Sequence, residues 1–263
     1  MKNYLSLIII FIMIAFTSCR SSKDFIYLKD AANEEIIKSI PVQTFDHNLK
    51  NGDILYVSIK SMNPEVNMLF NPEANMQSNV GGNDYQKYTT PSGAYLYGYE
   101  IDEDGNLKLP MLGKIKVSGI PVSQVESVVQ KKADEFLKDA IVKVKLLNYK
   151  VTVLGEVRNP GDYYNYNNTI TVLQAIAMAN GNTDYATIKK VMVVRPLPEG
   201  NKSYILDLTS KDIYLSDAYY LKPNDYVIVQ PDKNKFWAVN GQAISLILSS
   251  ISILLLTYGV FFK

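Results

Sequence analysis

Alternating apolar and polar positions predict a strand near each end of a first domain, which we place at residues 46–147. One alternating stretch follows the turn-like Asn-Gly-Asp at 51–53, and the other follows Asp139. Successive side chains of a strand point to opposite faces, so each predicted strand has one apolar face. Those faces carry Leu55, Val57 and Ile59 in the first strand, and Val142, Val144 and Leu146 in the second.

A hairpin is predicted between these strands, because two alternating stretches flank an Asp-Gly turn. The stretches read AYLYGYEI over 94–101 and NLKLPMLG over 106–113. The acidic residues Asp102, Glu103 and Asp104 lie in the turn itself. The glutamate that an EF-hand requires at its twelfth position is missing, so a solvated turn is favoured over a calcium loop or a catalytic carboxylate pair.

Apolar residues at helical spacing predict one helix after the hairpin. Ser123 and Glu126 have the spacing of a capping box, which would start this helix. Strands and one helix in this order indicate an α+β fold. The buried stripe of the helix would consist of Val122, Val125, Val129, Ala133, Phe136 and Leu137.

A second domain is predicted over residues 148–232, from several short strands and one helix. The helix would begin at Thr171 as its N-cap and end at Gly181, with Val172, Leu173, Ile176 and Ala177 as its apolar stripe. One helix over a mixed sheet of short strands is typical of a β-grasp-like fold. The pattern Leu-Lys-x-x-Asp precedes a strand in both domains, at 49–53 and 221–225, which we interpret as recurring local chemistry.

The last apolar stretch predicts a transmembrane helix over residues 236–262, since about 21 uncharged residues at 1.5 Å each can cross a bilayer core. Lys233, Lys235 and Trp237 stand just before its uncharged run from Gln242 to Phe262, as interfacial anchors would. Its polar side chains fall mainly on one face, which either lines water in a ring of several copies or packs against a neighbouring helix. The candidate channel-lining residues are Gln242, Ser245, Ser249 and Ser252.

The N-terminus has the pattern of a bacterial lipoprotein signal. Lys2 precedes an apolar run that is too short to span a membrane, and small residues then precede Cys19. The pattern predicts a signal peptide over residues 1–18, a lipid on the Cys19 thiol, and a lipidated tether over residues 19–45.

Composition excludes several classes of function. Lys and Arg total 27 while Asp and Glu total 26, so there is no electrostatic case for binding nucleic acid. Cys19 is the only cysteine and His47 the only histidine, and we find no metal-ligand, phosphate-loop or nucleophile motif. Glu156 and Arg158 could bind sugar or contact a subunit, although a solvated face is the commoner reading. We therefore expect no enzyme activity, cofactor or metal.

These residues resemble the polysaccharide biosynthesis/export family of outer-membrane lipoproteins. LKNGDILYVSI resembles the opening motif of the family, and the stretch from Ile101 to Glu126 resembles its central part. VTVLGEVRNPGDYY and TVLQAIAMANGNTDYA are similar to the soluble-ligand-binding β-grasp (SLBB) module that follows the export domain. The resemblance covers residues 45–232, with one β-grasp module where larger members have more.

The resemblance implies a homo-oligomeric ring in the periplasm, held at the outer membrane by lipid. Capsular polysaccharide or exopolysaccharide would pass unchanged through a barrel of C-terminal helices. An inner-membrane copolymerase or tyrosine kinase complex would supply the polymer. The alternative is a monomeric, membrane-anchored lipoprotein that binds glycan.

Overall fold

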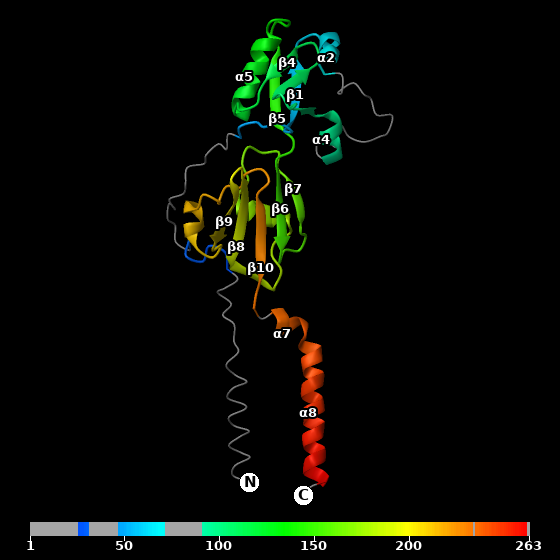
Figure 1. Cartoon of the computed structure of the whole chain (residues 1–263), viewed down its shortest axis with the longest axis vertical. Coiled ribbons are helices and arrows are strands. Elements are labelled where there is room, and N and C mark those ends of the chain that lie inside the picture. The colour runs from blue at the N-terminus through cyan, green and yellow to red at the C-terminus, as the bar shows by residue number, and fades with distance from the viewer. Residues whose placement is uncertain (1–25, 32–46, 72–90, 234, 262–263) are drawn as a thin grey trace.

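Two hydrophobic cores organise the chain (Figure 1). The computed structural model describes residues 26–31, 47–71, 91–233 and 235–261. One core extends from Leu49 to Val144 and the other from Tyr149 to Val229. Leu146 packs against both, so the cores meet at the connection between the two domains. The combination of sheets and helices confirms the predicted α+β class.

The first domain is built on a three-stranded antiparallel sheet of order β2-β1-β5. The alternation in the sequence predicted β1 (Ile54–Lys60) and β5 (Ile141–Leu146) correctly. Val57 lies opposite Val144 in the register, and both are buried. The apolar faces of the two strands therefore form one surface, which α5 (Val122–Ala133) joins through its buried Val125, Val129 and Ala133.

The predicted hairpin forms only next to its turn, where Ile101 pairs with Leu107 in an antiparallel bridge, and it is wrong for the residues before Tyr99. Residues Pro91–Tyr97 form a helix, α4, and only Tyr99–Glu100 form a strand, β2, which pairs with β1. The hairpin of the structure joins β3 (Asn106–Leu109) to β4 (Gly113–Lys116). Residues 94–97 are apolar or aromatic at every position, so they have no polar face to hold them in a strand. A proline is also well tolerated in the first turn of a helix.

The turn after β2 is confirmed, because Gly105 donates its N–H to the carbonyl of Asp102, whose side chain accepts from Asn106. The predicted capping box of α5 is absent. Pro121 is the N-cap of this helix, and no side chain caps it. The helix also ends earlier than its stripe suggested, and Phe136 is exposed. A short helix, α2 (Pro64–Phe70), follows β1.

The second domain is a five-stranded mixed sheet of order β7-β6-β10-β8-β9. The strands β6 and β10 are parallel, and the other neighbours are antiparallel. This mixed sheet is what the sequence predicted. The strands are β6 (Lys150–Gly155), β7 (Gly161–Tyr164), β8 (Ala186–Leu197), β9 (Gly200–Leu206) and β10 (Tyr226–Pro231).

One α-helix of this domain, α6 (Val172–Met178), begins as predicted. Thr171 accepts a hydrogen bond from the Gln174 N–H, and the Gln174 side chain accepts one from the Thr171 N–H. Gly181, with φ of 78°, follows the end of the helix. A 3₁₀ helix, η3 (Lys211–Leu215), lies before β10.

The end of β6 requires a glycine. Gly155 has φ of +88°, and a Cβ at this position would stand 2.1 Å from the backbone carbonyl oxygen of Val229. The next N–H, that of Glu156, donates to that same carbonyl at 2.9 Å. The close approach therefore closes the parallel pair of β6 and β10, and it leads the chain into Glu156.

The expected transmembrane helix over residues 236–262 is contradicted. The segment is divided at Asn240 into α7 (Lys235–Val239) and α8 (Gly241–Phe261), which run in different directions (Figure 1). Hydroxyl side chains also interrupt the apolar run of α8. In the part of the chain that the structure describes, no helix combines the length and apolarity needed to cross a membrane.

Candidate functional site

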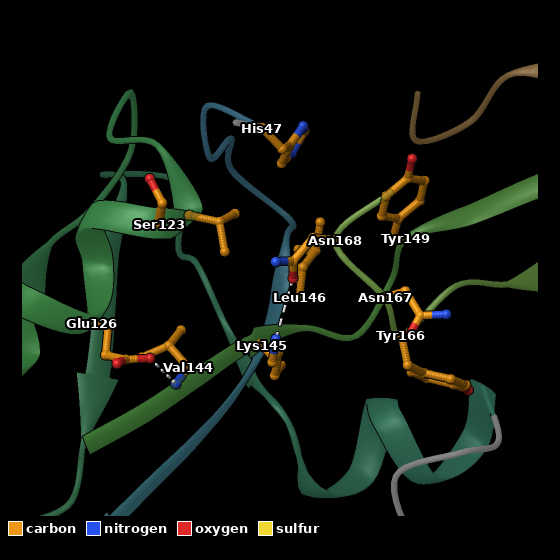
Figure 2. A pocket seen from close by; sticks show the side chains of 11 residues that line it. His47, Ser123, Glu126, Val144, Lys145, Leu146, Tyr149, Tyr166, Asn167 and Asn168 are labelled. Atoms are coloured by element: carbon orange, nitrogen blue, oxygen red, sulfur yellow. Dashed lines mark hydrogen bonds between the residues drawn. The ribbon is translucent and has the colours of Figure 1, made fainter. Parts of the chain in front are cut away.

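A pocket of about 340 Å³ lies at the junction of the two domains (Figure 2). The first domain contributes α5 and β5, and the second contributes Tyr149 and the loop after β7. Val122, Val144 and Leu146 give the lining its apolar part. Its polar side chains include Ser123, Glu126, Lys145, Tyr166, Asn167 and Asn168.

Hydrogen bonds connect the polar lining to both domains. Lys145 Nζ on β5 donates to Asn168 Oδ1 at 3.3 Å, which joins one wall to the other. Glu126 Oε2 accepts from the Val144 N–H at 3.4 Å. At the edge of the pocket, His47 Nε2 lies 2.7 Å from Asp53 Oδ2. The side chains are thus held in place by structural contacts, and most remain accessible to solvent.

Tyr149 is the most enclosed aromatic residue of the lining. Its hydroxyl donates to the Leu221 carbonyl at 2.6 Å, and burial raises the pKa of this phenol well above its usual range. The phenol therefore stays protonated at physiological pH and serves as a donor. Among the described residues, no group of three or more His, Cys, Asp or Glu side chains could hold a metal ion. The arrangement suits hydrogen-bonded recognition of a polar ligand.

Glu156 lies at a second junction, between the second domain and α7. Its carboxylate accepts hydrogen bonds from Lys235 Nζ and, at 2.7 Å, from Thr183 Oγ1. The bond from Lys235, followed by that from Thr183, lowers the pKa of Glu156. Glu156 is therefore buried and does not lie on the solvated face that the sequence had favoured. Arg158 is exposed, as expected. Lys235 likewise holds α7 to the domain, which differs from the expected interfacial anchor.

The candidate channel-lining residues lie along α8. Gln242, Ser245, Ser249 and Ser252 are all exposed. The three serine hydroxyls donate to backbone carbonyls of the preceding turn, at 2.8, 2.6 and 2.9 Å. Exposed apolar side chains, among them Leu246, Ile247 and Leu254, occupy other positions of the helix.

The candidate lipidation site, Cys19, lies outside the described residues, but part of the expected tether is described. Residues 26–31 dock on the second domain, where Leu28 and Lys29 donate their N–H groups to the carbonyls of Leu208 and Thr209. Asp30 accepts from Ser210 Oγ and from the Lys211 N–H. The tether is therefore anchored on the domain from which α7 departs.

Sequence reasoning missed the pocket between the domains. Its polar residues come from several separate segments, so no local sequence motif predicts the pocket. The asparagine-rich stretch at 165–168 was the available signal, and it reads equally well as a loop.

Two family models match the sequence one after the other. A model described as polysaccharide biosynthesis/export protein matches residues 42–147, and an SLBB domain model matches residues 149–229. The junction between the two matches falls where the structure passes from one core to the other.

Curated relatives share parts of the sequence. The EPS I polysaccharide export outer membrane protein EpsA of Ralstonia solanacearum is 26% identical over 153 residues, which cover 56% of this chain and 40% of that protein. The polysialic acid transport protein KpsD of Escherichia coli is 38% identical over 77 residues, or 27% of this chain and 14% of that protein. The chain thus spans well under half the length of these relatives.

Proposed function

Because this chain belongs to the polysaccharide biosynthesis/export proteins, with an SLBB domain after its export domain, we propose that it is a non-enzymatic subunit of a polysaccharide exporter. The observation that carries the proposal is the succession of the two domain matches, over residues 42–147 and 149–229. The names of EpsA and KpsD, an export and a transport protein, support the same function. EpsA is named as an outer membrane protein, and we place this chain at the outer membrane too.

The proposed working form is a homo-oligomeric ring that conducts capsular polysaccharide or exopolysaccharide. The exposed apolar side chains of α8 support it, because an apolar helix surface of this extent is normally covered by a partner. Copies of α8 that pack side by side would cover one another. The hydroxyl face of Ser245, Ser249 and Ser252, with Gln242, would then line the polymer path. Weak, exchangeable hydrogen bonds there would let the polymer slide.

A lipid on Cys19 would hold the ring at the membrane. The docked segment 26–31 supports this placement, because a chain extends at most about 3.5 Å per residue. The seven positions from Cys19 to Ile26 therefore keep the lipid within roughly 25 Å of the SLBB domain. An inner-membrane copolymerase or tyrosine kinase complex would deliver the polymer from the periplasmic side.

The proposal is tested with the full-length chain extracted in mild detergent and viewed by electron microscopy. We expect rings with a central opening, and we expect a strain that lacks the chain to lose surface polysaccharide. Monodisperse monomers in several detergents, together with normal surface polysaccharide in that strain, would contradict the proposal. Affinity for free glycan in such monomers would favour the alternative, a glycan-binding lipoprotein.

The lumen assignment has its own test. Replacing Ser245, Ser249 and Ser252 with leucine should reduce surface polysaccharide without loss of the protein from the membrane fraction. Ser250→Leu with Thr257→Leu is the matched control, because these two hydroxyls lie on a different stripe of the same helix. Normal export by the triple variant would remove the serines from the polymer path.

A further inference from the structure

The pocket between the export and SLBB domains has the features of a small-molecule site. Its volume, about 340 Å³, lies at the lower end of the range of about 300–1,000 Å³ in which small ligands bind. Both domains supply walls, and sites at domain junctions are common. A ligand of one or two sugar rings is the size that such a pocket takes.

The polar side chains of the pocket match the chemistry of a sugar. Each sugar hydroxyl is both a donor and an acceptor, so its site must offer both. Asn167 supplies donors and an acceptor through one planar amide, and Glu126 supplies acceptors. Tyr166, which is 41% exposed, offers an aromatic surface to the apolar side of a ring.

The existing hydrogen bonds leave capacity for a ligand. An ammonium has three donors, and Lys145 uses one toward Asn168. A carboxylate has about four lone-pair sites, and Glu126 accepts a bond from the Val144 N–H. A ligand would therefore bind to groups already fixed in position, which lowers the entropic cost of binding.

The charge of the pocket selects among sugars. One carboxylate, Glu126, and one ammonium, Lys145, offset each other, and His47 lies against Asp53. No net charge is left to hold an acidic sugar. A neutral hexose or an N-acetylhexosamine is the ligand that fits this balance.

We propose that this pocket binds one or two neutral sugar rings of the exported polymer, in contact with both domains at once. The identity of the ligand rests on the proposed function, whereas the site rests on the geometry of the pocket. Ser123 and Glu126 belong to the export domain, and Asn167 and Asn168 belong to the SLBB domain. A bound sugar therefore fixes the angle between the domains, and each subunit holds the polymer weakly at this junction.

The test is saturation-transfer NMR on the full-length protein in detergent, with three probes of similar size. Cellobiose and N,N′-diacetylchitobiose are neutral, and an unsaturated hyaluronan disaccharide carries a carboxylate. We expect the neutral disaccharides to bind, and the acidic one to bind more weakly. Binding of none of the three, or preference for the acidic disaccharide, would overturn the proposal.

Two variants locate the binding site. Asn167→Ala combined with Asn168→Ala should weaken binding about tenfold, because each lost hydrogen bond costs about 0.5–1.5 kcal/mol. Glu126→Gln keeps the shape of its side chain and should also weaken binding. Asn201→Ala, at an exposed asparagine of β9, should leave binding unchanged. Unchanged binding in the double variant and in Glu126→Gln would place the sugar elsewhere and refute the site.

The outcome is separable from that of the proposed function. If the wild-type protein restores surface polysaccharide but binds none of the disaccharides, only the proposed sugar site is refuted. If it binds them at this pocket but its loss leaves surface polysaccharide unaltered, only the proposed export function is refuted.

Discussion

Asp53 and Asp225 occupy the same position in two matching turns, one in each domain. Each carboxylate accepts a hydrogen bond of 2.8 Å from the backbone N–H of the lysine three residues earlier, Lys50 or Lys222. The residue before each aspartate has a positive φ, 83° in one turn and 67° in the other. The shared Leu-Lys-x-x-Asp pattern therefore produces one turn that leads into β1 and again into β10.

The two aspartates differ in the side chain that lies against the carboxylate. Asp53 is paired with His47, and both side chains are 14% exposed. Asp225 is fully buried and receives hydrogen bonds of 3.0 and 2.7 Å from Nε and Nη2 of Arg195. The turn of the SLBB domain is thus held by a buried, bidentate ion pair.

Asp225→Asn should therefore destabilise the protein much more than Asp53→Asn. Removing one member of a buried pair leaves the Arg195 charge without its counter-ion, at a cost of about 3–5 kcal/mol. Asp53→Asn, at a partly exposed site, should lower the free energy of unfolding by about 1 kcal/mol. Urea unfolding followed by circular dichroism measures both losses. Equal losses in the two variants would show that the buried ion pair is not the dominant stabilising feature.

The attachment of α7 should weaken in acid. The pKa of Glu156 is lower in the folded state than in the unfolded chain, because Lys235 and Thr183 donate to its carboxylate. This contribution is fully present above the unfolded-state pKa of about 4.3, and it is lost as the pH falls through the lower folded-state pKa. The protection of the amides of residues 235–239 from hydrogen exchange, relative to their intrinsic rate at each pH, should therefore fall below about pH 4. Glu156→Gln should show the same loss of protection at neutral pH, and unaltered protection in that variant would show that the Glu156–Lys235 contact does not hold α7.

Gly155→Ala should disrupt the sheet of the SLBB domain. Its Cβ would meet the Val229 carbonyl, and its positive φ would add strain of about 1–3 kcal/mol. Gly161→Ala is the matched control, since a Cβ there meets nothing within 4 Å. Thermal unfolding should show a large loss for the first variant and little change for the second. Similar melting temperatures for both would mean that β6 and β10 can move apart without cost.

Thr171→Ala should cost about 1 kcal/mol, because it removes the hydroxyl of a complete capping box. Ser123→Ala is the comparison at α5, where the serine does not cap the helix, and it should cost less. Chemical denaturation of the two variants distinguishes them. A larger loss for Ser123→Ala would indicate that its hydroxyl has a structural role beyond capping.

Sequence patterns predicted most of the strands, because the alternation of residues such as Leu55, Val57 and Ile59 reflects one buried face. Local capping chemistry predicted Thr171 correctly and Ser123 incorrectly, since both have the right spacing but only Thr171 has N-cap geometry. The strand predicted for residues 94–97 is a helix in the structure, because uniformly apolar residues fit a helix as well as a strand.

The functional features were harder to predict because they depend on contacts between distant segments. Glu156 meets Lys235 across 79 positions, and Lys145 meets Asn168 across the domain boundary. Single-residue properties gave no sign of either contact. The sequence shows directly that Ser245, Ser249 and Ser252 lie at helical spacing. It does not show that the helix is interrupted at Asn240.

The docking of residues 26–31 also sets an order of events during folding. Asp30 binds the Lys211 N–H, which lies 181 positions later in the chain. Domains generally fold as units. The export domain can therefore fold before the SLBB domain has formed the site that Asp30 binds. Residues 26–31 therefore dock late, after the SLBB domain has folded.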